Sequence, residues 1–155
     1  MRIQSKNLYI IFGTIAVIVA IIFLAIILTK KDTVNNPSVD LTNKLVIKTS
    51  SSDVIIPDIT KNANINIPGG VLFIDESYYS ISYFSVDQGF IITLKNSNLQ
   101  KARDLAEADF LKQLNLDQIS ACNLKVTLNV PWSIGFDAAG VNYGLSFCSS
   151  SVALP

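Results

Sequence analysis

The sequence predicts an α+β fold, in which an N-terminal transmembrane helix precedes a small domain with one helix packed on a mostly antiparallel sheet. Three observations predict it. Residues 8–28 form a run of 21 residues without a single charge. One later stretch, residues 99–116, has the apolar periodicity of a helix. Strand-like runs lie on both sides of that stretch, which is the pattern of a helix packed on a sheet.

Residues 8–28 have the length and composition of a membrane-spanning helix. Half of the chain is hydrophobic and 15% is charged, against about 25% charged residues in soluble domains. A helix of 21 residues spans roughly 30 Å, the thickness of the hydrocarbon core of a bilayer. No Ala-x-Ala pattern and no Cys lie directly after the run, which is typical of an uncleaved signal anchor. We expect the lipid bilayer to be its partner.

This helix divides the chain into parts. The expected parts are a short N-terminal tail (1–7), the transmembrane helix (8–28), a linker (29–44) and an extracytoplasmic domain (45–155). The linker is rich in polar residues and contains a proline, as connecting segments often do. The Lys and Arg residues near the two ends of the helix are balanced, so the positive-inside rule does not assign a side of the membrane.

The cysteine content favours a location of the C-terminal domain outside the cytoplasm. The only two cysteines, Cys122 and Cys148, both lie in the C-terminal domain. An even number of cysteines in an exported domain suggests a disulfide. Two separate buried thiols are the alternative, because cysteine is also a common core residue. The disulfide interpretation predicts a domain outside the cytoplasm.

The first half of the domain predicts a series of short strands. Residues 45–47 are a short apolar segment that suits a first strand. Residues 54–56 and 65–67 are either short edge strands or an ordered loop. Residues 71–74 are apolar, and residues 78–86 have a strand-like composition rich in Tyr, Ile, Phe and Val. A Gly-containing turn at residues 87–89 joins this run to residues 90–94, which predicts a hairpin.

The helix at residues 99–116 is the clearest element of the domain. Ser97 or Asn98 can cap its N-terminus, and Asn115 suits its C-terminus. The apolar residues recur every three or four positions, and they are Leu99, Ala102, Ala106, Phe110 and Leu114. Two charged pairs, Arg103 with Glu107 and Lys101 with Asp104, are expected on the opposite, solvent-exposed face.

Strand-like patterns return after the helix. Residues 123–130 alternate strictly between apolar and polar side chains, which predicts a strand with one buried and one wet face. Pro131 ends this strand, and residues 132–143 form a loop. Residues 145–148 suit a short last strand, which a disulfide would tie to the start of the preceding one.

The composition excludes several kinds of site. The chain has no His, which removes Ser-His-Asp and Cys-His triads, and two Cys alone cannot hold a structural zinc ion. Residues 40–155 have a net charge of −3, whereas nucleic-acid binding needs a basic surface. Ser146, in half of a nucleophile-elbow pattern, is better explained as a strand residue. Lys48 with the serines at 50–52 could form a dyad only if the lysine were buried. We therefore expect no catalytic, cofactor or metal site and no enzyme.

Aromatic residues supply the one candidate binding surface. Trp132, Phe136 and Tyr143 lie together in the loop that the two cysteines enclose. An aromatic loop on a rigid frame is a reasonable binding surface. The alternative is that these rings fill the core of a small domain, as Tyr and Phe residues of the hairpin would also do.

Residues 99–148 resemble a group of proteins. The resemblance rests on a helix segment, a strand segment and a C-terminal segment, whose residues are Ala102-Arg103, Ala106-Glu107, Phe110-Leu111, Leu114, Ala121-Cys122, Leu124, Val126, Pro131, Ala139-Gly140 and Gly144-Leu145-Ser146-Phe147-Cys148. The chain is similar there to uncharacterised membrane-anchored envelope proteins of uncultured, small-genome bacteria. The resemblance implies an envelope location and a paired Cys122 and Cys148, but no function.

These observations favour a membrane-anchored binding or structural protein of the bacterial cell envelope, which binds another envelope protein or itself. The first alternative is a pilin-like or pseudopilin-like subunit, which the order of hydrophobic helix, α+β head and C-terminal disulfide loop resembles. The chain departs from pilins because no acidic residue precedes Asp32 and because Gly13 lies inside the apolar run. A Ser-based hydrolase is the third hypothesis.

Overall fold

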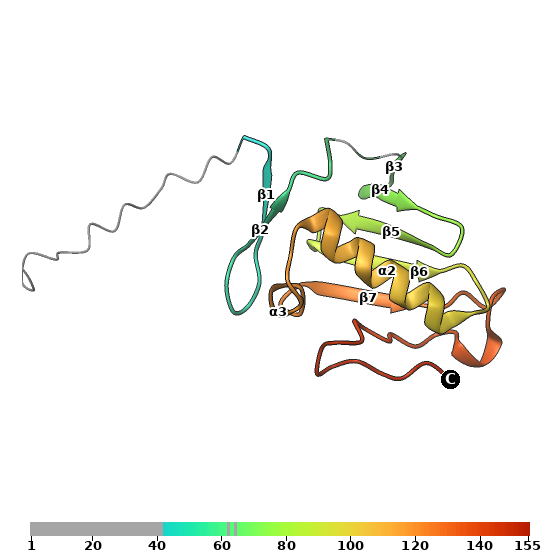
Figure 1. The fold of residues 1–155 in the computed structure, drawn as a ribbon. Helices are drawn as coiled ribbons and strands as arrows, with labels where there is room; N and C mark the ends of the chain where they lie inside the picture. The colour runs from blue at the N-terminus through green and yellow to red at the C-terminus, as the bar shows by residue number, and fades with distance from the viewer. Residues whose placement is uncertain (1–41, 62, 64) are drawn as a thin grey trace, which may run out of the picture. The chain divides into compact units, whose positions relative to one another are not determined.

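The computed structural model describes residues 42–61, 63 and 65–155. Their elements, in order, are β1 (Lys44–Ile47), β2 (Val54–Pro57), β3 (Ile65–Ile67), β4 (Gly70–Asp75), β5 (Tyr79–Phe84), β6 (Gly89–Leu94), α2 (Leu99–Leu114), the short α3 (Gln118–Ala121), β7 (Lys125–Asn129) and the 3₁₀ turn η1 (Phe136–Ala138) (Figure 1). The predicted small α+β domain, with one main helix and a mostly antiparallel sheet, is confirmed.

The predicted tail, transmembrane helix at residues 8–28 and nearly all of the linker lie outside the described residues. Within the described part of the chain, no helix has the length and apolar character needed to cross a membrane.

The main sheet has five strands in the order β3-β4-β5-β6-β7. β5 and β6 form the predicted hairpin, in which Tyr79 pairs with Leu94 and Phe84 with Gly89. β6 and β7 are parallel because α2 carries the chain back across the sheet between them, as a parallel pair requires. The segments at residues 54–57 and 65–67 are strands, and the first pairs with β1 in a separate two-stranded sheet.

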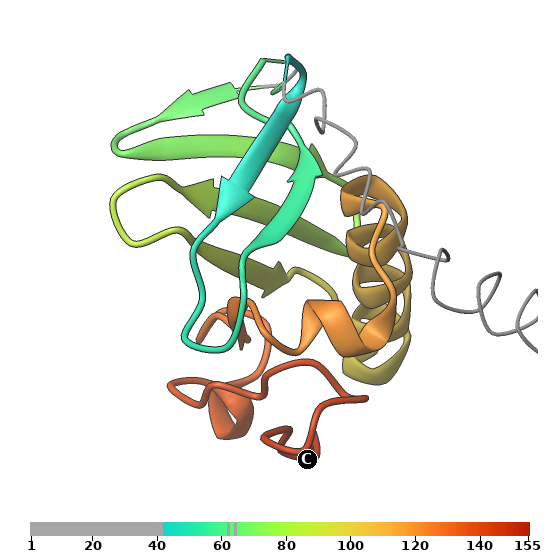
Figure 2. The same ribbon diagram turned by 90° about the vertical axis from the view of Figure 1, so that its left-hand side faces the viewer.

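α2 begins and ends where its sequence predicts. The side chain of Asn98 accepts a hydrogen bond from the backbone N–H of Lys101 at 3.3 Å, and Asn115 adopts the left-handed conformation with φ of 51°. Its small and apolar residues Ala102, Ala106 and Phe110 are fully buried against the sheet. Phe110 meets Phe90 of β6 edge to face, with 5.2 Å between the ring centroids. The helix thus covers one face of the sheet, and no described helix covers the other (Figure 2).

The β1–β2 hairpin closes the core at the end of the sheet where β7 begins. Ile47 and Ile56 are buried, with at most 1% of their surface exposed. The backbone N–H of Lys48 donates to Oε1 of Gln88 in the β5–β6 turn at 2.7 Å. Hydrogen bonding of Ser51 Oγ to Asn123 Oδ1 at 3.0 Å ties the hairpin to the start of β7.

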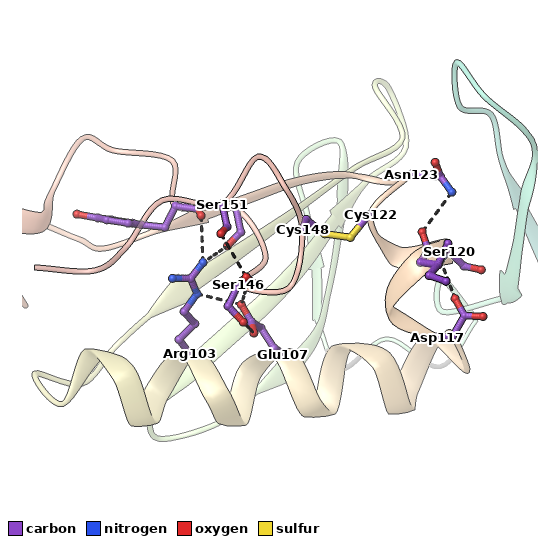
Figure 3. Close-up of a disulfide and its surroundings, with 12 residues drawn as sticks. Arg103, Glu107, Asp117, Ser120, Cys122, Asn123, Ser146, Cys148 and Ser151 are labelled. Carbon is purple, nitrogen blue, oxygen red and sulfur yellow. Dashed lines mark hydrogen bonds and ion pairs between the residues drawn. A yellow bond between two sulfur atoms is a disulfide. The ribbon is translucent and has the colours of Figure 1, made fainter.

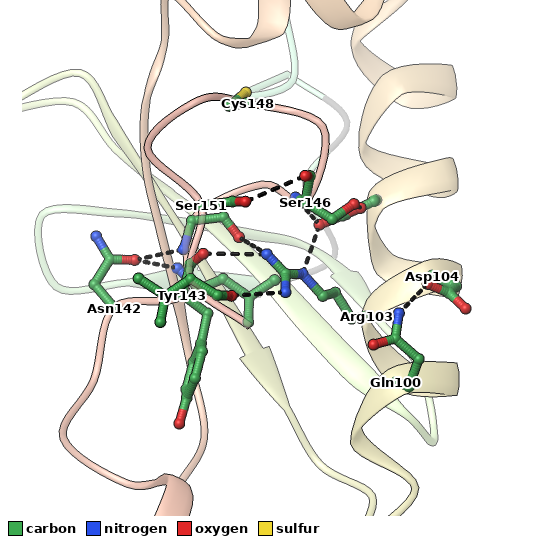
Figure 4. A network of polar contacts seen from close by, with 12 residues as sticks. Gln100, Arg103, Asp104, Asn142, Tyr143, Ser146, Cys148 and Ser151 are labelled. Carbon is green, nitrogen blue, oxygen red and sulfur yellow. Dashed lines mark hydrogen bonds and ion pairs between the residues drawn. The ribbon is translucent and has the colours of Figure 1, made fainter. Parts of the chain in front are cut away.

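Arg103 and Glu107 lie on the buried side of α2, so the expectation of a solvent-exposed pair is wrong. They are 3% and 6% exposed, and Arg103 Nε donates to Glu107 Oε1 at 2.9 Å. The Arg103 guanidinium also donates to three backbone carbonyls of the C-terminal segment, those of Tyr143 at 3.1 Å, Gly144 at 3.0 Å and Val152 at 3.0 Å (Figure 4). Arg103 and Glu107 therefore face the interior because the backbone carbonyls of the C-terminal segment need hydrogen-bond donors there.

Glu107 holds the same segment by its other contacts. Its carboxylate accepts hydrogen bonds from the backbone N–H of Ser146, at 2.6 Å, and from the Ser146 hydroxyl. Gly144 has φ of +59°, a conformation that glycine adopts without strain. It sits at the turn where two consecutive carbonyls both accept from the same nitrogen of Arg103.

Residues 145–148 form no strand, which corrects that prediction. Their hydrogen-bonding groups serve α2 and local turns, such as the bond from the Cys148 N–H to the Leu145 carbonyl at 3.0 Å. Cys122 and Cys148 form a disulfide with 5.6 Å between their Cα atoms, as predicted. It joins the end of α3 to the C-terminal segment beside the Arg103 and Glu107 contacts (Figure 3).

Replacing Glu107 by Gln is expected to lower the free energy of unfolding by about 3 kcal/mol, because it leaves the buried guanidinium without its counter-charge. Asp104→Asn makes the same change of charge on the exposed face of α2 and should change stability by less than about 0.5 kcal/mol. Urea titrations followed by near-ultraviolet circular dichroism measure both. Equal effects of the two variants would contradict the assigned role of Glu107.

Removing the disulfide by the double substitution Cys122→Ala and Cys148→Ala should also destabilise the domain. The cysteines are 26 residues apart, and a loop of that length gives about 3.5 kcal/mol in the chain-entropy model. The same urea titration measures the loss. Dithiothreitol should reproduce it in the unsubstituted protein and have no effect on the double variant, and a response of the double variant would point to another cause.

Candidate binding surface

The loop after β7 is held from below by buried side chains. Val130 is 3% exposed and Ala138 is 2% exposed. The backbone N–H groups of Ile134 and Gly135 both bond to the Pro131 carbonyl, at 3.0 and 3.2 Å, so the chain turns tightly just after the strand. The loop is therefore a fixed structure on the sheet, and its remaining side chains project from a rigid base.

Trp132 and Phe136 are the two large side chains that this base leaves outside. They are 63% and 73% exposed, and their rings meet edge to face with 4.9 Å between centroids. Such a pair is worth about 0.5–1.5 kcal/mol beyond the area it covers. The contact fixes the orientation of the two exposed aromatic rings relative to each other.

Tyr143 does not belong to that surface. It is 3% exposed, and its hydroxyl donates to the Ala138 carbonyl at 2.8 Å. The ring is thus a buried prop beneath the loop, which is the alternative that the sequence left open for these aromatics. The hairpin rings of Tyr79, Tyr83 and Phe90 are buried as well.

Asn142 fastens the loop to the free edge of β7. Its Oδ1 accepts from the backbone N–H of Leu128 at 3.0 Å, and the Tyr143 N–H donates to the Leu128 carbonyl at 2.9 Å. Both outward-pointing backbone groups of Leu128 are therefore occupied. An edge strand with such groups free can pair with another chain, and here the loop takes that place.

Two hollows lie on the sheet face opposite α2. The first, about 500 Å³, lies over the start of β6 and β7, where the exposed pair Lys125 and Asp87 are 2.6 Å apart. The second, about 490 Å³, lies between the sheet and the aromatic loop. Thr93 of β6 and Thr127 and Asn129 of β7 form its floor, and Trp132 and residues 140–142 form its wall. The two hollows share Thr127, so together they follow β6 and β7 along the open face.

The second hollow contains an unusual polar atom. Oδ1 of Asn129 is buried and has no hydrogen-bond partner among the described residues. A buried polar atom without a partner costs about 1–3 kcal/mol, so such atoms are rare in native structures and call for an explanation. Asn129 also lines the second hollow, so the unpaired oxygen lies next to that hollow.

The shifted titrations belong to structural contacts. Hydrogen bonding to Lys125 holds the pKa of Asp87 below its usual value. Burial, followed by the hydrogen bond to Asp109, raises the pKa of Tyr79 well above its usual value. Hydrogen bonds from Ser120 lower the pKa of Asp117, which caps α3. None of these groups lines the second hollow.

The residues considered for Ser-based chemistry are placed differently from what that chemistry needs. The Lys48 side chain is 70% exposed and pairs with Asp53 at 2.6 Å, so it lacks the burial that activates a lysine base. Ser146 lies outside any strand and directs its hydroxyl to Glu107. In the described part of the chain, no three Asp, Glu or Cys residues gather as metal ligands would.

Sequence reasoning found the aromatic half of this surface and missed the polar half. Asn129 and Thr127 were visible as the wet positions of an alternating strand, but nothing in their spacing distinguishes a ligand-facing position from a solvated one. Thr93 joins them because it pairs in register with Asn129 across two parallel strands, and α2 separates those strands in the sequence.

Comparisons with protein-family models, curated proteins and solved structures find no match to this chain.

The exposure of Trp132 can be measured directly, because it is the only tryptophan in the chain. We expect acrylamide to quench its fluorescence with a Stern–Volmer slope more than about half that of the urea-unfolded protein, since 63% of its surface is exposed. Phe136→Ala should steepen the slope by removing the neighbouring ring. A slope near zero would mean that the ring is covered.

Proposed function

We propose that residues 42–155 form the extracytoplasmic binding domain of a single-pass, membrane-anchored protein of the bacterial cell envelope. The observation that carries the proposal is the ordered, exposed pair of Trp132 and Phe136 beside a polar hollow, on a loop fastened to the sheet. Rigid scaffolds that present aromatic side chains on a loop are typical of binding sites. The proposal assigns no catalytic reaction to this surface.

Two further observations support the location. Disulfides persist in oxidising compartments and are rare in the cytoplasm, and Cys122 and Cys148 are paired. The uncharged run at residues 8–28 has the length of a membrane anchor. A binding surface outside the membrane would meet other envelope components or a second copy of the chain.

Topology and redox state can be tested together in intact cells. A membrane-impermeant maleimide should label Cys122 and Cys148 only after treatment with an impermeant reductant, because a disulfide protects both thiols. Peptide mass shifts measure the labelling. Labelling that appears only after lysis, without reductant, would refute the external domain and the disulfide together.

A Val86→Cys variant provides the control for topology alone. Val86 is 90% exposed, so a cysteine there should react in intact cells without reductant if the domain is outside. Protection of this cysteine until lysis would place the domain in the cytoplasm whatever the state of the disulfide.

A pilin-like filament subunit is the second candidate. The Cys122–Cys148 disulfide encloses a C-terminal loop on an α+β domain, which resembles the head of such subunits at the level of fold. Mechanical shearing of cells separates the two candidates. A filament subunit would sediment with the sheared surface material, whereas an anchored binding protein would stay with the membrane.

A further inference from the structure

The second hollow, between Trp132 and the strand residues Thr93, Thr127 and Asn129, has a chemistry that selects its ligand. We propose that it binds a neutral saccharide, with a pyranose ring against Trp132 and ring hydroxyls on the polar floor. This inference rests on the proposed binding function and names the class of ligand that the surface takes.

The lining combines polar and apolar side chains and carries no charge. None of the described residues around the hollow is Asp, Glu, Lys or Arg. A phosphate or another anion is recognised by Lys, Arg or a cluster of backbone N–H groups, and a cationic group is recognised by carboxylates. An uncharged hollow therefore favours a ligand without net charge.

The floor offers hydrogen-bonding groups that the protein leaves unused. The Asn129 Oδ1 atom has no partner among the described residues, and the hydroxyls of Thr93 and Thr127 make no hydrogen bond there either. Rotation about the last torsion of an Asn side chain is soft, so the Asn129 carboxamide can turn toward a donor in the hollow. Several acceptors and donors within one small area match the closely spaced hydroxyls of a sugar.

The wall supplies the complementary apolar contact. Trp132 carries the only indole ring of the sequence, and the residue is 63% exposed. One face of a pyranose ring consists of C–H groups, which are attracted to the electron-rich face of an indole ring. The volume of about 490 Å³ falls within the usual range of about 300–1,000 Å³ for small-ligand sites and can hold a mono- or disaccharide.

Other occupants fit less well. A peptide that adds to the sheet needs a free strand edge, and on β7 the loop residues Asn142 and Tyr143 already bond to both outward backbone groups of Leu128. A lipid chain would leave the Asn129 carboxamide without a partner, which costs free energy. A sugar satisfies the floor and the wall at once.

The test uses the full chain in lipid nanodiscs, because detergents with sugar headgroups would compete. Maltotriose, cellotriose and chitotriose are titrated by isothermal calorimetry, and purified cell-wall sacculi are tested by co-sedimentation. We expect saturable binding of at least one of these probes, with Trp132→Ala and Asn129→Ala each weakening it tenfold or more. Thr93→Val, which removes one hydroxyl at constant shape, should weaken it severalfold.

Asn66→Ala is the matched control, because Asn66 is an exposed residue on the distant edge strand β3. It should leave the affinity unchanged, and circular dichroism melting curves should show that all four variants are folded. Binding that survives both Trp132→Ala and Asn129→Ala, or no binding to any of the four probes, would overturn the saccharide proposal.

A photo-crosslinking amino acid at position 136 separates failure of this inference from failure of the proposed function. Capture of envelope glycan on intact cells would support both. Capture of a protein alone would overturn the saccharide site and leave the binding domain in place. The proposed function itself fails if the impermeant maleimide labels the Val86→Cys thiol only after lysis, because the domain then lies in the cytoplasm.

Discussion

The buried ion pair of Arg103 and Glu107 is the contact that holds the C-terminal segment, residues 143–152, on the domain. Removing two charges from water is costly, and their attraction offsets that cost only when the remaining hydrogen-bonding groups are also satisfied. Here Arg103 donates to three carbonyls beyond residue 142, and Glu107 accepts from Ser146. The pair therefore replaces the strand ladder that the segment does not form, since its backbone groups bond to one helix face.

The disulfide and the ion pair act on the same segment by different physics. The Cys122–Cys148 bond restricts the unfolded chain and so stabilises mainly by entropy. The contacts of Arg103 and Glu107 favour the folded arrangement directly through charge-assisted hydrogen bonds. The segment needs both, because it contributes few buried side chains, among them Tyr143 and Leu145, to hold it by packing alone.

Local rules predicted what local forces determine. The caps Asn98 and Asn115, the hairpin turn at residues 87–89 and the alternating strand near Leu128 follow from interactions within a few residues. The position of Arg103 does not, because its carbonyl partners lie 40 or more residues away, and an i,i+4 charged pair is normally a surface feature. The prediction of a strand at residues 145–148 was wrong for the same reason. A strand-like pattern cannot reveal that a side chain of a helix forms hydrogen bonds with this backbone. Of the candidate surface, Trp132 and Phe136 were predictable as loop aromatics, whereas Asn129 became a candidate only through the burial of its unpaired oxygen.

Asn142 connects the second hollow to the contacts that Arg103 and Glu107 make with residues 143–152, which we call the clamp. Its Oδ1 bonds to Leu128 and Gly144, the residue whose carbonyl Arg103 holds, and the same side chain lines the hollow beside Trp132. A ligand that requires this wall binds only the assembled segment, so its binding free energy adds to the stability of the clamp. Conversely, loosening the clamp lowers the population of the binding-competent surface and weakens the apparent affinity by the same factor. If the proposed site is correct, Arg103 and Glu107 therefore affect its affinity without touching the ligand, because they hold the segment that carries Asn142.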